Sequence, residues 1–94
     1  LMSSDHAKLR HCWSVVRPKV VFAQSGAQFT PALAVLRQLD PDIAVVTVDG
    51  EGGTPFGELA ATPAGPEVAA ALDRVGPATV AKYLFTSGST GLPK

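Results

Sequence analysis

Apolar residues recur in three stretches of the chain at spacings of three, four and seven positions. This spacing places them on one face of a helix, so each stretch predicts an amphipathic helix. The apolar positions are Leu9, Cys12, Trp13 and Val16 in the first stretch, Ala32, Val35, Leu36 and Leu39 in the second, and Val68, Ala71, Leu72 and Val75 in the third.

Capping residues and prolines predict where these helices begin and end. The first helix should begin at an N-cap, Ser4 or Asp5, and end at Arg17, because Pro18 follows. The second should begin at the N-cap Thr30, with Pro31 in its first turn, and end at Asp40-Pro41. The third should begin at Pro66 and end at the C-cap Gly76.

Three apolar runs lie between and after the helices, at residues 20–23, 43–48 and 80–85. The first two are nearly continuous in apolarity, which is typical of parallel strands buried on both faces. The Gly- and Pro-rich stretch 50–66 predicts a surface excursion with one turn of helix around Phe56 and Leu59. The fold class that we predict is three-layer α/β, a parallel-strand sheet segment with flanking helices.

Composition narrows the class of protein. The 94 residues allow one domain, and 46% hydrophobic against 17% charged residues indicates the interior of a folded protein. Eight basic and eight acidic side chains cancel, which argues against a nucleic-acid partner, and we interpret Lys8, Arg10 and His11 as a solvated helix face. The single cysteine, Cys12, predicts a packed thiol in a reducing compartment.

The sequence contains no membrane or export signal. No apolar run approaches the length of about 20 residues that spans a bilayer, and no signal peptide is recognisable, so we expect a cytoplasmic protein.

The ends of the chain suggest a larger protein. The chain begins at Leu1 and stops inside its best motif, and three helices are too few to cover both faces of a parallel sheet. We therefore expect residues 1–94 to be part of a large N-terminal domain and to pack against the remainder of the same polypeptide.

The C-terminal residues carry the strongest chemical signal. An apolar run leads into Thr86-Ser87-Gly88-Ser89-Thr90-Gly91, and Lys94 follows. Glycines let backbone N–H groups approach anionic oxygens, the hydroxyls add donors, and the lysine adds a positive charge. We predict that Thr86, Ser87, Gly88, Ser89, Thr90, Gly91 and Lys94 bind phosphate.

Residues 86–94 resemble the phosphate-loop signature of the adenylate-forming (AMP-binding) superfamily over nine consecutive positions, and Phe85 fills the preceding aromatic position. The resemblance implies an acid–thiol ligase that uses ATP and Mg²⁺ to convert a carboxylic acid into an acyl-adenylate, and then transfers the acyl group to coenzyme A. The segments 18–23, 29–36 and 81–85 are similar to the feruloyl-CoA synthetase branch, which implies an aromatic acid as substrate. The family's catalytic residues should follow Lys94, so we expect these residues alone to be inactive and no catalytic residue among them.

Two other interpretations stay open. Ser87-Gly88-Ser89-Thr90-Gly91 differs in one position from the nucleophile elbow of α/β-hydrolases, with Ser89 as the nucleophile. Alternatively, the chain is a non-catalytic α/β binding module with a flexible Ser/Gly tail. A Walker A loop is excluded because Pro93 stands where its second glycine belongs. His6 and His11 lie on different helix faces, and we expect no metal site.

Overall fold

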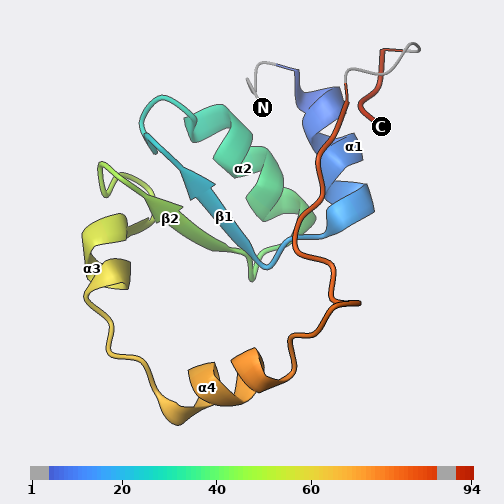
Figure 1. Cartoon of the computed structure of the whole chain (residues 1–94). Coiled ribbons are helices and arrows are strands. Elements are labelled where there is room, and N and C mark those ends of the chain that lie inside the picture. The colour runs from blue at the N-terminus through green and yellow to red at the C-terminus, as the bar shows by residue number, and fades with distance from the viewer. Residues whose placement is uncertain (1–4, 87–90) are drawn as a thin grey trace.

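The computed structural model describes residues 5–86 and 91–94 (Figure 1). Helices and strands alternate through the first half of the chain, and the second half holds a two-residue strand, two short helices and an extended C-terminal segment. The elements are α1 (His6–Val16), β1 (Val20–Ala23), α2 (Thr30–Leu39), β2 (Ala44–Thr47), β3 (Thr54–Pro55), α3 (Phe56–Ala60) and α4 (Pro66–Asp73).

The strands form one parallel sheet in the order β1-β2-β3. Val20 pairs with Ala44, Ala23 pairs with Thr47, and Thr47 pairs in turn with Pro55. The α/β class, the parallel sheet and the flanking helices are thus confirmed. So is the turn of helix predicted around Phe56 and Leu59, which is α3.

The predicted strand at residues 80–85 is wrong, because these residues form no ladder and run as an extended segment past α1 (Figure 1). The third strand is β3, from the stretch that we expected to be a surface excursion. The apolar residues at 80–85 would suit a strand, but a strand forms only where the folded chain places the segment beside another strand. Pro55 has no N–H to donate, which suits β3 to the edge of the sheet.

Helices α1 and α2 cover one face of the sheet. Val45 of β2 packs in a buried cluster with Leu9 of α1 and with Leu33 and Leu36 of α2. Trp13, Val21 and Phe29 pack around this cluster. Most of the apolar positions predicted for the first two helices therefore lie in or against the core, and Cys12 is buried as predicted. Val16 is the exception: it is 37% exposed at the end of α1.

The ends of these two helices follow local chemistry. Asp5 caps α1, since its carboxylate accepts from the Lys8 amide over 3.1 Å, and α1 ends before Pro18 with Arg17 in the left-handed conformation at φ 47°. The predicted N-cap of α2 is wrong by one residue: Phe29 is the cap, and Thr30 lies inside the first turn. The Thr30 hydroxyl donates to the Gly26 carbonyl oxygen over 2.8 Å, as helical threonines do when they bond the preceding turn.

The third predicted helix, α4, is shorter than expected and does not contribute to the core. It ends at Asp73 with Arg74 as C-cap, so the predicted C-cap at Gly76 is wrong. Val68 and Leu72 are 54% and 69% exposed, and among the described residues none in α4 is buried. The apolar stripe predicted from the sequence is therefore present on α4, but it is exposed and does not pack against the core.

No helix within residues 5–86 and 91–94 combines the length and the apolarity that a membrane span needs.

Thr47 is the most deeply buried side chain of the sheet, at 0% exposure, and its hydroxyl oxygen has no hydrogen-bond partner among the described residues. Since an unpaired buried hydroxyl costs free energy, Thr47→Val should raise the free energy of unfolding by about 1 kcal/mol. Urea denaturation measures this. The matched control is Thr30→Val, which removes a hydroxyl that does donate and should lower stability by a similar amount. A loss of stability in Thr47→Val would contradict the prediction.

Candidate phosphate-binding loop

The stretch predicted to bind phosphate begins and ends at the same point in space. The Thr86 amide donates to the Lys94 carbonyl oxygen over 2.6 Å, and the Lys94 amide donates to the Thr86 carbonyl oxygen over 3.1 Å. The Thr86 hydroxyl lies 3.3 Å from the same Lys94 oxygen and donates to it. This reciprocal backbone pair closes residues 86–94 into a loop.

Helix α1 anchors the loop near its C-terminal end. Pro93 is buried, and Nε2–H of His11 donates to the Pro93 carbonyl oxygen over 2.8 Å. We had interpreted His11 as part of a solvated face, and this is wrong because the side chain is half-buried against Pro93. No local sequence signal could have found this contact, because 82 positions separate the two residues.

The structure assigns different parts to the predicted site residues. Thr86 directs its amide and hydroxyl to Lys94, so its described role is to close the loop. Gly91 has φ 87°, a left-handed conformation in which a side chain would be strained, and the Lys94 side chain is exposed. Ser87, Gly88, Ser89 and Thr90 lie outside the described residues.

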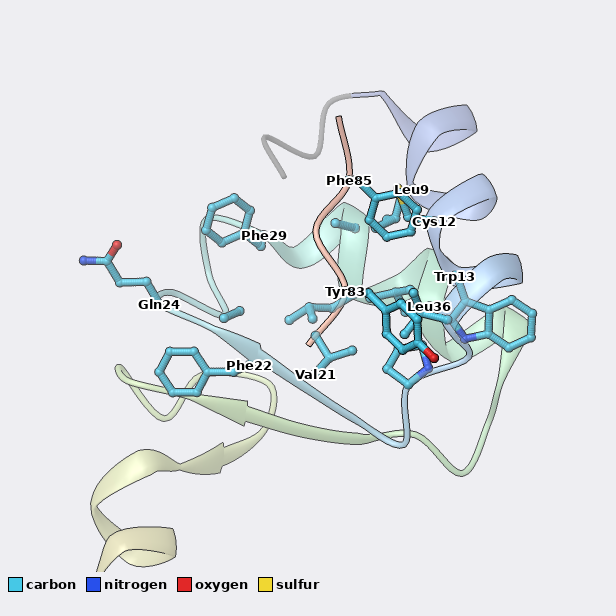
Figure 2. A pocket seen from close by; sticks show the side chains of 15 residues that line it. Leu9, Cys12, Trp13, Val21, Phe22, Gln24, Phe29, Leu36, Tyr83 and Phe85 are labelled. Atoms are coloured by element: carbon cyan, nitrogen blue, oxygen red, sulfur yellow. The ribbon is translucent and has the colours of Figure 1, made fainter. Parts of the chain in front are cut away.

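An apolar hollow of about 720 Å³ lies beside the segment that leads into the loop (Figure 2). Trp13 of α1, Val21 of β1 and Leu36 of α2 line it, and Tyr83 and Phe85 of the C-terminal segment lie across it. Tyr83 and Leu84 remain 67% and 77% exposed. The segment therefore rests on the helical layer without being packed into it.

A second group of polar residues lies where β1 and β2 end, away from the loop (Figure 1). The Asp49 carboxylate accepts from the Gly26 amide over 2.9 Å, the Ser25 hydroxyl over 2.7 Å and the Glu51 amide over 3.0 Å. The Gly26 amide, followed by the Ser25 hydroxyl, holds the pKa of Asp49 well below its usual range. All of the described donors are used within the protein, so this group joins two turns and offers no evident ligand site.

Close backbone packing supports the same connection. A Cβ on Gly26 would lie 1.6 Å from the Glu51 carbonyl oxygen, so only glycine fits there. On the other side of the Glu51 turn, the Arg37 guanidinium of α2 donates to the Gly52 carbonyl oxygen. Residues 51–52 thus form a turn that is tied both to α2 and to the turn that follows β1.

Among residues 5–86 and 91–94, no group of three His, Cys, Asp or Glu side chains is placed to hold a metal ion. The described part of the chain therefore supplies no carboxylate cluster for the Mg²⁺ that the resemblance implies.

Removing the His11 side chain should loosen the closed loop. In His11→Ala, the Pro93 carbonyl loses its donor, so the amides of Thr86 and Lys94 should exchange with solvent severalfold faster. Hydrogen exchange followed by NMR measures both amides. His6→Ala, on the same helix, is the control and should leave them unchanged. Equal exchange rates in His11→Ala and the wild type would show that α1 does not anchor the loop.

The Asp49 connection should make stability depend on pH. Its pKa is lower in the folded protein than in the unfolded chain, so its contribution is complete at neutral pH and is lost as the pH falls below about 4. Asp49→Asn should therefore lower the free energy of unfolding more at pH 7 than at pH 3. Urea denaturation of both proteins at the two pH values measures the difference. Asp42→Asn is the control, and an Asp49→Asn effect that does not change with pH would contradict the prediction.

We compared the chain with models of protein families, with curated proteins and with solved structures. None of the three comparisons found a match. The case for a function rests on the residues of the loop and on the contacts at its two ends.

Proposed function

We propose that residues 86–94 form a polyphosphate-binding loop, and that the protein is an ATP-dependent carboxylate–CoA ligase. The observation that carries the proposal is the agreement of two features at the same positions. The sequence matches a phosphate-loop pattern over nine consecutive residues, and Thr86 and Lys94, the two ends of that pattern, are hydrogen-bonded to each other. The pairing of these two ends supports a closed loop over a flexible linker.

The closed loop suits the chemistry of an anion site. Fixing the two ends lowers the conformational freedom that the loop loses when a ligand binds. Small residues occupy the interior of the loop, so backbone N–H groups can approach phosphate oxygens. Lys94 adds an exposed positive charge at the mouth of the loop.

The proposed reaction assigns the loop a limited task. A carboxylate oxygen of the substrate attacks the α-phosphorus of ATP, which forms an acyl-adenylate and releases pyrophosphate. The thiol of coenzyme A then attacks the acyl carbon, which gives a thioester and AMP. By holding the β- and γ-phosphates, the loop would orient the leaving group and stabilise the negative charge that develops on it. Mg²⁺ would enter bound to the nucleotide phosphates.

Substrate class and cellular location belong to the same proposal. Similarity of three segments to the feruloyl-CoA synthetase branch supports a hydroxycinnamate-like aromatic acid. The single, buried Cys12 supports a reducing compartment, which we propose to be the cytoplasm.

Calorimetric titration of the protein with Mg-ATP tests the proposed loop. Because a charge-assisted hydrogen bond contributes about 1.5–3 kcal/mol, replacing Thr90 and Lys94 together by alanine should weaken binding at least about tenfold. The control is Lys82→Ala, which removes an exposed lysine outside the loop and should leave the affinity unchanged.

Titration with pyrophosphate and with AMP locates the contact on the nucleotide. A loop that holds the β- and γ-phosphates should bind pyrophosphate and lose that binding in the double variant, whereas AMP should respond little. Equal Mg-ATP affinity in the double variant and the wild type would reject the loop, and would favour a binding module with a Ser/Gly tail.

A further inference from the structure

The face of the sheet opposite α1 and α2 is only partly covered. Val21 and Val45 share the face that packs on α1 and α2, so Phe22 and Val46, which are in register, lie on the other face. There the Phe56 ring of α3 meets the Phe22 ring edge to face at 5.6 Å, and Val46 is buried.

An apolar patch remains exposed beyond α3. Val20 and Phe22 are each 56% exposed, and Ala44, in register with Val20, is exposed as well. We call Val20, Phe22 and Ala44 the open face. Strands of a parallel sheet are normally buried on both faces, so an exposed patch at this position calls for a cover.

Helix α4 has the complementary surface. Val68 and Leu72 lie one turn apart on one side of the helix, and Val75, just beyond its end, continues the stripe. Glu67 and Asp73 lie away from this stripe on the helical wheel. In Figure 1, α4 stands apart from the sheet. No described residue of α4 is buried, so its apolar stripe is exposed.

The chain also holds α4 within reach of the open face. α3 already lies on this side of the sheet through Phe56, and only residues 61–65 separate α3 from α4. A linker of five residues spans at most about 18 Å, so it keeps α4 at a high effective concentration near the open face. An outside partner would have to compete with this tethered helix.

We propose that α4 is a mobile cover that closes onto the open face, with Val68 and Leu72 against Val20 and Phe22, and that the structure shows its open position. Closing removes both apolar surfaces from water without breaking any described hydrogen bond of α4 to the rest of the protein. Its cost is the ordering of the linker residues 61–65 and 74–79, which makes the closed state sensitive to single apolar contacts.

Disulfide trapping in the whole chain tests the cover. In Val20→Cys with Leu72→Cys, an oxidant should form an intramolecular disulfide at least about tenfold faster than in Val20→Cys with Ala70→Cys. Ala70 is exposed and lies about 200° around the helix from Leu72, so it faces away when α4 is closed. Both proteins share the buried native Cys12, which gives an equal background. Loss of free thiols and mobility on a non-reducing gel measure the rate.

Each outcome decides the proposal. Fast intramolecular crosslinking in Val20→Cys with Leu72→Cys, but not in Val20→Cys with Ala70→Cys, supports it. Equal rates for the two pairs, or no crosslink in either, overturn it. Covalent dimers in place of the intramolecular product also overturn it, because they show that the open face meets a second copy. If circular dichroism shows that Val20→Cys is unfolded, Ala44→Cys replaces it, because Ala44 is exposed on the same face.

Discussion

A parallel sheet has to be covered on both faces, and this constraint governs the whole structure. Parallel strands carry apolar side chains on both sides, so each side needs a helical layer. On one side α1 and α2 supply that layer, and the buried cluster of Leu9, Leu33 and Val45 results. On the other side, α3 is the one element in contact within residues 5–86 and 91–94, through Phe56 against Phe22. The well-packed and the incomplete parts of the molecule are therefore the two faces of the same sheet.

The turns that follow β1 and β2, at the carboxyl end of the sheet, are joined by polar contacts and by close backbone packing. Asp49 holds the turn after β1 to the turn after β2 by accepting three hydrogen bonds, and Gly26 lets the two backbones approach. Such a crosslink fixes the relative positions of the strand ends without adding to the apolar core. It also explains why acidic residues at this end of an α/β sheet need not mark a ligand site.

The proposed phosphate loop depends on a different support. Its ends are paired with each other, and α1 holds it through His11 and the buried Pro93. The preceding residues 80–85 pair with no strand in the part of the chain that the structure describes. The described contacts therefore fix the two ends of the proposed loop relative to each other and tie its C-terminal end to α1.

The sequence by itself determined the elements whose signals are local. Asp5 and Pro18 mark the ends of α1, apolar spacing identifies the buried faces of α1 and α2, and the Gly- and Ser-rich pattern identifies the candidate loop. Only the tertiary structure decided which apolar segments pair. In the folded chain, β3 and not the segment 80–85 is the third strand of the sheet, and the apolar side of α4 is exposed. The hydrogen bond from His11 to Pro93 also forms only there. The physical reason is that apolarity and helical spacing are properties of neighbouring residues, whereas strand pairing and long-range hydrogen bonds depend on where the folded chain brings distant residues together.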